Sequence, residues 1–268
     1  MDPLTQGLLG ASFGQALYGR ALGRRALVWG AIVGMAPDLD VVANPVSPMA
    51  EWLWHRGPTH ALWFGPVVGP AIGWMLWKWK GGRLRDWVGL AIVALLTHPL
   101  LDVFTTYGTQ LLSPFSRQRF AFDAVAILDP AYSLVLALGL VLGLWRGVGT
   151  ATARRAAGAA LVVSSAYLGL GLVVNDRAEE VARRQLAAEG LSQARVAAYP
   201  TLFQLPFRRV VARSGAEVRI GWLSLIAPRP IAWERFEAAS GPAVEAARLT
   251  AEVRVLEWFA MGEATPRV

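Results

Sequence analysis

The 268-residue sequence contains no cysteine and only three histidines, His55, His60 and His98. Without cysteine there can be no disulfide, no thiolate nucleophile and no cysteine-based zinc site, so any metal must be bound by histidines and carboxylates. Charged residues are also scarce, at 17% against 54% hydrophobic residues, and the mean hydropathy is +0.40. This composition argues against an ordinary soluble protein and indicates a membrane protein.

The net charge of +7 is not gathered in a basic tail, so it gives no reason to expect nucleic acid as a partner. In the first 174 residues the excess of basic side chains lies in three short clusters beside apolar runs, as in proteins oriented in a membrane. The N-terminal Met1-Asp2-Pro3 lacks the basic region of a signal peptide. We therefore expect the apolar segments to be retained.

Four apolar runs have the length of about 20 residues that a bilayer core requires. They are Ala61 to Trp79, Trp87 to Tyr107, Ile127 to Trp145 and Ala156 to Val174. Two shorter apolar pieces, Leu4 to Tyr18 and Ala26 to Ala36, precede them, and they are short for full spans. The pattern predicts an α-helical polytopic membrane bundle of about six helices, of which the first two are short.

The basic residues predict how this bundle is oriented, because cytoplasmic loops are enriched in Lys and Arg. One set of connections holds ten bases and a single acid, Asp86. The bases are Arg20, Arg24, Arg25, Lys78, Lys80, Arg83, Arg85, Arg146, Arg154 and Arg155. Six helices alternating across this pattern place the N-terminus and everything after Val174 outside the cytoplasm.

Residues 175–268 have the composition of a water-soluble module. Asp176 to Leu191 predicts an amphipathic helix that extends the last span, and alternating residues on either side of Ser214-Gly215 predict a β-hairpin. A further helix is expected from Ser240-Gly241-Pro242 to about Phe259. We therefore divide the chain into a transmembrane helical domain, residues 1–174, and a small extracytoplasmic α+β domain, residues 175–268.

Polar residues with metal-binding chemistry lie at the predicted outer ends of three segments. Asp38 and Asp40 end the second apolar piece, and His55 and His60 lie in the connection before the next span. His98 and Asp102 are four residues apart and so share one face of a helix. Three imidazoles and three carboxylates at one depth are the ligand types that zinc or another divalent transition metal binds.

Each of these residues has a structural explanation as well. His98 could bond a carbonyl of a neighbouring helix, and Asp38 and Asp40 could end a helix after Pro37. Asp129 before Pro130 is better explained as a helix N-cap than as a ligand. Glycines at positions 65, 69 and 73 predict a seam where two helices pack closely, rather than a phosphate site.

The same residues also carry a resemblance to a known family. The segments PDLD at 37–40, HRGPTH at 55–60 and THPLLDVFTTYGTQLLSPFS at 97–116 resemble bacterial inner-membrane, metal-dependent hydrolases, some of which are described as LexA-binding. The resemblance extends from the opening MDPLTQGLLG to YPTLFQLPFRRVV in the tail. It implies metal ligands at Asp38, Asp40, His55, His60, His98 and Asp102. Relatives often have histidine at the position of Gln6, so the resemblance also implies an altered site here.

We therefore expect a metal-dependent hydrolase with one or two Zn²⁺ ions, acting on a lipid or lipid-linked phosphoester at the outer face of the bacterial inner membrane. Asp38 or Asp40 would serve as general base if not as ligand, and Arg56 would bind the substrate phosphate. Thr59 and Thr105 could orient these groups. The alternative is a metal-stabilised structural or interaction protein without catalysis. Transport is less favoured, because acids and histidines are missing from the cytoplasmic half of every predicted span.

Overall fold

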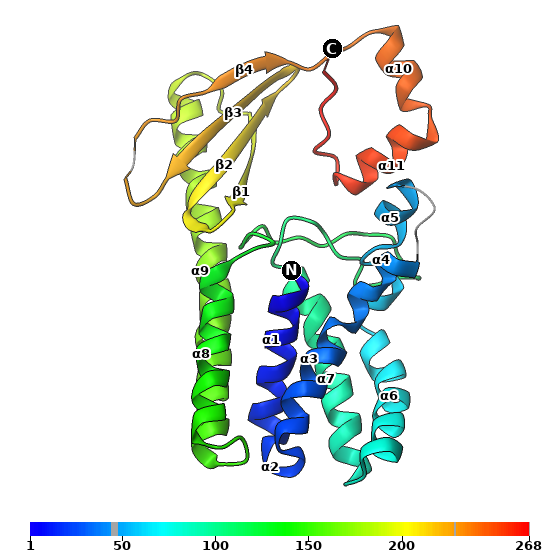
Figure 1. The fold of residues 1–268 in the computed structure, drawn as a ribbon. Helices are drawn as coiled ribbons and strands as arrows, with labels where there is room; N and C mark the ends of the chain where they lie inside the picture. The colour runs from blue at the N-terminus through cyan, green and yellow to red at the C-terminus, as the bar shows by residue number, and fades with distance from the viewer. Residues whose placement is uncertain (44–47, 228, 268) are drawn as a thin grey trace.

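The protein consists of a helical part followed by a four-stranded sheet, as shown by a computed structural model that describes residues 1–43, 48–227 and 229–267 (Figure 1). The longer helices are α1 (Pro3–Phe13), α3 (Arg24–Met35), α6 (Phe64–Lys80), α7 (Leu84–Asp102), α8 (Pro130–Arg146) and α9 (Ala151–Ala188). A π-helical turn, η1 (Gly14–Tyr18), and α2 (Gly19–Leu22) join α1 to α3. These helices coincide closely with the predicted apolar runs.

The helix ends follow from local sequence signals. Asp2 caps α1, where its Oδ1 accepts from Thr5 N–H at 3.0 Å, and Pro3 occupies the first turn. Asp129 caps α8 by accepting from the N–H groups of Ala131 and Tyr132, each at 3.1 Å. The N-cap explanation of Asp129 is therefore confirmed.

Two of the described helices, α7 and α9, are long and apolar enough to cross a membrane, and α8 is a shorter apolar helix. The apolar surface of α9 is largely uncovered: Val162 is 69% exposed and Val173 is 64% exposed. Apolar side chains that face outward along a helix are expected where lipid surrounds it. Six full spans thus stay a prediction, as does the direction of the bundle.

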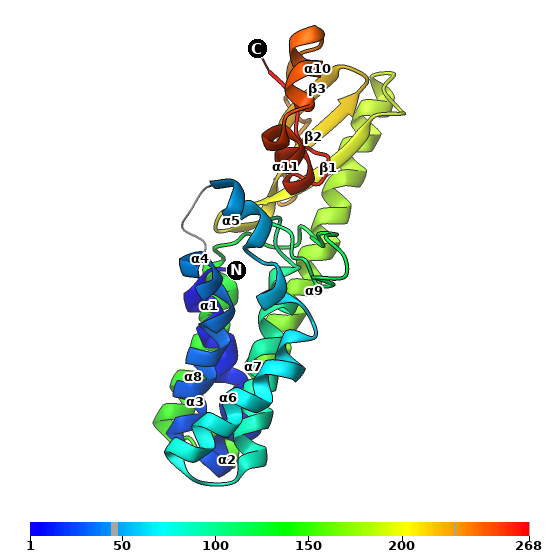
Figure 2. The same ribbon diagram turned by 90° about the vertical axis from the view of Figure 1, so that its right-hand side faces the viewer.

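The helical part has two distinct ends. The turns that carry the basic residues, at α2, between α6 and α7 and between α8 and α9, all lie at the lower end of Figure 1. The N-terminus and the sheet lie toward the upper end, and the view in Figure 2 shows the same arrangement.

Close packing of α6 against α7 depends on small residues. A Cβ atom added at Gly69 would lie 2.7 Å from the Ile92 side chain, and one at Gly73 would lie 2.5 Å from Val88 Cα. Only glycine permits this approach, so the predicted packing seam is confirmed. The seam holds α7 in place, and α7 carries two of the candidate ligands.

The C-terminal sheet is antiparallel with strands in sequence order: β1 (Arg195–Thr201), β2 (Gln204–Ser214), β3 (Glu217–Ser224) and β4 (Glu234–Glu237). The pairing of Ser214 with Glu217 forms the hairpin expected around Ser214-Gly215. The last three turns of α9 pack on the sheet through a core that includes Ala182, Leu186 and Val210. Because α9 continues without a break past Val174, one helix connects the two predicted domains.

The helix expected from Ser240 to Phe259 is instead two helices, α10 (Pro242–Arg248) and α11 (Ala251–Phe259). Thr250 causes the break, because its side chain accepts from Val253 N–H and so caps a new helix. Trp52, in α5 (Pro48–Trp54), stacks on Phe259 with ring centroids 5.4 Å apart. The helix α11 thus lies against α5, above the bundle in Figure 1.

Candidate metal centre

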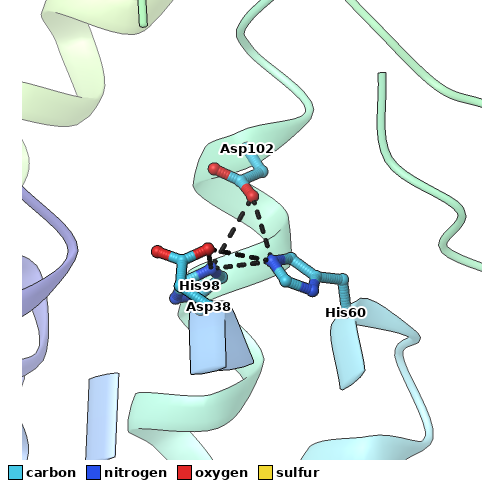
Figure 3. A group of neighbouring side chains, drawn as sticks. All are labelled: Asp38, His60, His98 and Asp102. Carbon is cyan, nitrogen blue, oxygen red and sulfur yellow. Dashed lines mark hydrogen bonds and ion pairs between the residues drawn. The ribbon is translucent and has the colours of Figure 1, made fainter. Parts of the chain in front are cut away.

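Four of the predicted ligands converge at the end of the bundle nearest the sheet. Asp38 comes from η2 (Ala36–Leu39), His60 from η3 (Pro58–His60), and His98 and Asp102 from the last turns of α7 (Figure 3). One ligand atom from each lies within 4.8 Å of all the others. His60, His98 and Asp102 are fully buried, whereas the Asp38 side chain is 15% exposed.

The protons on both histidines can be assigned from their neighbours. His98 Nδ1 lies 2.6 Å from the carbonyl oxygen of Gly34, and since a carbonyl only accepts, Nδ1 carries the proton. The Thr59 hydroxyl donates to Asp40 Oδ2 at 2.8 Å, so its oxygen can accept from His60 Nδ1 at 3.0 Å. In the neutral form, each ring therefore presents a lone pair at Nε2.

These two lone pairs face each other and two carboxylates. The Nε2 atoms of His60 and His98 are 3.0 Å apart, and Asp38 Oδ1 lies 3.4 and 3.3 Å from them, respectively. Asp102 Oδ2 lies 3.4 Å from His60 Nε2 and 3.7 Å from His98 Nε2. A tetrahedral zinc site with bonds of about 2.0–2.1 Å has edges of about 3.3 Å, so these spacings fit such a site.

The buried Oδ2 of Asp102 accepts no hydrogen bond, whereas its Oδ1 is well supplied with donors. Gln6 Nε2 donates to Oδ1 at 2.9 Å, and the amino group of Met1 donates to the same atom. Oδ2 is left facing the two imidazoles, with Arg56 Nε at 3.2 Å as an ion-pair partner. Converging acceptors that lack donors are the arrangement expected for a cation site. The residues present therefore fit a divalent metal.

Asp40 and His55 lie beside the four converging residues rather than among them. Asp40 accepts from His55 Nδ1 at 2.8 Å and from the backbone N–H of Arg56 at 3.2 Å, and its Oδ2 is 3.4 Å from His60 Nδ1. Burial raises the pKa of Asp40, but hydrogen bonds from His55 and His60 outweigh it, so the pKa lies below its usual range. An ionised Asp40 behind His60 orients that ligand.

Arg56 is buried and lies against the cluster. Its backbone has a positive φ of 58°, its Nη1 donates to Thr105 Oγ1 at 3.1 Å, and its guanidinium is 4.5 Å from the centroid of the Tyr107 ring. Arg56 thus offsets part of the negative charge of the carboxylates. Thr59 and Thr105 contact the predicted residues, as expected, whereas Tyr107 and the Gly34 carbonyl had no sequence signal of their own.

Gln6, at the position where the resemblance led us to expect histidine, also reaches the cluster. Besides Asp102, its Nε2 contacts the carbonyl oxygen of His98 at 3.2 Å, and its buried Oε1 has no hydrogen-bond partner. The position is therefore adjacent to the centre, and here an amide supports Asp102 from it.

Comparison with known proteins identifies the family of this chain. The sequence profile of the YdjM inner membrane protein family matches residues 1–178, a range that contains all four converging residues. The chain belongs to this family. It is 34% identical over 121 residues to "Inner membrane protein YbcI" of Escherichia coli (strain K12), covering 44% of this chain and 69% of that one.

The chain is also 33% identical over 98 residues to "Uncharacterized protein YfhP" of Bacillus subtilis (strain 168). This match covers 35% of the chain and 29% of YfhP, so the chain spans less than a third of that relative's length. No solved structure matches the chain.

Proposed function

We propose that this member of the YdjM family is a membrane-bound, metal-dependent hydrolase acting on a lipid or lipid-linked phosphoester at the outer face of the inner membrane. The observation that carries the proposal is the convergence of two imidazole lone pairs and two carboxylates within 4.8 Å. His60, His98, Asp102 and Asp38 would hold the metal, for which Zn²⁺ is the best candidate given the nitrogen and oxygen ligands.

A divalent metal bound at this position would supply a water nucleophile at neutral pH, because it would lower the pKa of the water from 15.7 toward about 7. Proton transfer and phosphate binding would depend on side chains of the protein. Asp38 is the most exposed of the four groups and would accept a proton from this water if it does not hold the metal. Arg56 places a guanidinium beside the carboxylates, where it can pair with a phosphate oxygen.

The location supports a membrane substrate. The centre lies at the end of the bundle opposite the basic turns, and Lys and Arg mark the cytoplasmic side of inner-membrane proteins. The predicted multi-pass topology, with the C-terminal domain outside the cytoplasm, follows from the same rule. At the predicted outer end of the bundle, the site would meet lipid headgroups, which is why we favour a phosphoester carried on a lipid.

The second candidate is a metal-stabilised structural or interaction protein, and one observation favours it. If all four side chains hold the metal, they would fill a tetrahedral shell, as in structural zinc sites, whereas catalytic sites keep one position open. Hydrolysis at this centre therefore requires Asp38 to give up its place or the coordination to expand to five.

Cobalt substitution and turnover separate the two candidates. The purified protein, loaded with Co²⁺, would be titrated with azide and assayed against bis(p-nitrophenyl) phosphate and phospholipid vesicles. A hydrolase shows a visible spectrum that changes with azide and turnover that Asp38→Ala removes; Asp86→Asn, at the other end of α7, is the control. Bound metal with an inert spectrum and no turnover would establish the structural alternative. Protein that binds no metal would refute both.

A further inference from the structure

A cavity of about 920 Å³ lies between the sheet and the C-terminal helix, separate from the four metal-binding residues. The segment after α7 forms another wall, and Figure 1 shows these three parts facing one another. Most lining residues are apolar or aromatic, among them Ile127, Tyr199, Leu202, Trp222, Leu256 and Phe259. A volume of this size with few polar groups is typical of a small-molecule site.

Asp123 is the carboxylate of this cavity, and the metal centre does not use it. Its backbone has φ = 51°, a conformation uncommon outside glycine, and its buried Oδ1 has no hydrogen-bond partner. Burial, with repulsion from Glu179 and Glu263, raises the pKa of Asp123 to about 7 despite attraction from Arg208. The Asp123 carboxylate thus lines the cavity, with one of its oxygens buried and unpaired.

Arg209 is the complementary group. It lies 5.4 Å from the centroid of the Tyr199 ring and makes no ion pair within the described part of the chain. The other lining arginine, Arg213, is neutralised by Glu263, which also pairs with Arg195 at 3.0 Å. One available cation, one available carboxylate and an apolar wall match a zwitterion that carries a hydrocarbon chain.

The surroundings of the cavity favour a lipid over a soluble zwitterion. Leu202 is 56% exposed and Trp222 is 61% exposed, so apolar side chains continue from the lining onto the surface. The segment that follows α7, a candidate membrane span, supplies Thr106 and Tyr107 to the same lining. Tyr107 also contacts Arg56, so the cavity adjoins the residues around the metal centre.

We propose that this cavity binds a phospholipid with a primary-amine headgroup, with the ammonium at Asp123, the phosphate at Arg209 and an acyl chain along the apolar wall. The proposal deepens the proposed function by naming a lipid class. Only turnover of this lipid rests on the proposed hydrolase activity; binding of the lipid can be tested without it.

The test is calorimetric titration of the purified full-length protein with four short-chain probes. They are dihexanoyl phosphatidylethanolamine, the phosphatidylcholine and phosphatidylglycerol analogues, and glycerophosphoethanolamine, which has no acyl chain. Phosphatidylethanolamine should bind about tenfold tighter than phosphatidylcholine, because only its ammonium donates charge-assisted hydrogen bonds. This preference should grow from pH 6 to pH 8, as Asp123 ionises.

Variants assign the two contacts. Asp123→Asn should abolish the preference for the amine, and Arg209→Gln, at an exposed position, should weaken all three phospholipids alike. Glu234→Gln and Arg248→Gln, which remove charges away from the cavity, are the controls and should bind like the unaltered protein. Equal affinity for the three phospholipids at both pH values, or a preference that survives Asp123→Asn, would overturn the proposal.

Two further outcomes distinguish related hypotheses. Glycerophosphoethanolamine binding as tightly as the lipid would show a headgroup site without a chain-binding wall, and so would refute the lipid assignment. His98→Ala should still bind phosphatidylethanolamine while losing metal. Lipid binding without turnover in the metal-loaded protein would therefore leave this inference intact and count only against the hydrolase.

Discussion

Replacing His98 should weaken metal binding much more than replacing His55. His98→Ala removes one of the four converging atoms, whereas His55→Ala removes only a hydrogen bond to Asp40, which in turn contacts His60. His98 would contact the metal directly, whereas His55 acts on the centre only through Asp40 and His60. If the geometry is correct, the same substitution should have a much larger effect at position 98 than at position 55.

The loss of metal affinity expected for each variant can be estimated from the number of ligands. Structural zinc sites with four ligands bind with about 10–16 kcal/mol, so an equal share is about 2.5–4 kcal/mol per ligand, or two to three orders of magnitude in Kd. Loss of an outer partner costs about 10- to 100-fold in affinity. His98→Ala should therefore weaken binding by about 100- to 1000-fold, whereas His55→Ala, which acts on the partner Asp40 and not on a ligand, should weaken it by no more than about 10-fold.

Competition of the detergent-purified protein with a chromophoric zinc chelator measures both values. Asp86→Asn serves as the matched control, because Asp86 lies in the first turn of the helix that ends in Asp102 and its ion-pair partner among the described residues is the exposed Arg83. The control should bind zinc like the unaltered protein. Equal losses at positions 55 and 98, or full affinity in the His98 variant, would refute the four-residue centre.

Three further predictions concern packing and pH. Gly73→Ala should destabilise the protein by about 1–3 kcal/mol in denaturant unfolding, since the new methyl meets the α7 backbone, whereas Gly158→Ala, which meets nothing within 4 Å, should be neutral or stabilising. Arg208→Ala should lower the free energy of unfolding by at least about 2 kcal/mol, because the buried Arg208 donates to the carbonyls of Ala124 and Gly171. It should also speed proteolysis between the two parts of the protein. Arg209→Ala, at an exposed position, should have neither effect. Folding raises the pKa of Asp123 to about 7, from an unfolded value of about 3.9, so the folded state binds this proton more tightly. The free energy of unfolding should therefore fall as pH rises from 4 to 7. Asp123→Asn should reduce that fall.

The helices and the position of the centre followed from the sequence because their signals are local. Apolar runs fixed α6 to α9, and the spacing of His98 and Asp102 placed both on one face of α7. The division of Asp38 from Asp40, and of His60 from His55, could not be predicted in this way. Asp38 lies in the 3-10 turn η2 and Asp40 follows it, whereas His60 lies in the 3-10 turn η3 and His55 precedes it, so the separation depends on how these short turns are placed by tertiary packing.

Longer-range features had no signal in the sequence at all. The Gly34 carbonyl that fixes His98 becomes a partner only because α3 crosses close to α7. The cavity at Asp123 requires the sheet to stand over the segment after α7, and the buried Arg208, which reads as one more base in the tail, holds that arrangement. Single residues do not reveal such contacts, because their burial is decided by tertiary packing.

The placement of prolines suggests how four acceptors can be held together before a metal binds. Pro37 precedes Asp38, Pro58 starts the turn that ends at His60, and Pro99 follows His98. Proline fixes φ near −65° and so reduces the freedom of the backbone beside each ligand. The entropy lost in bringing these acceptors together is then lost largely during folding and not on binding, so it reduces the metal affinity less. The same rigidity makes it costly for a ligand to leave the metal, so Asp38, the partly exposed one, is the residue on which the choice between catalysis and structure depends.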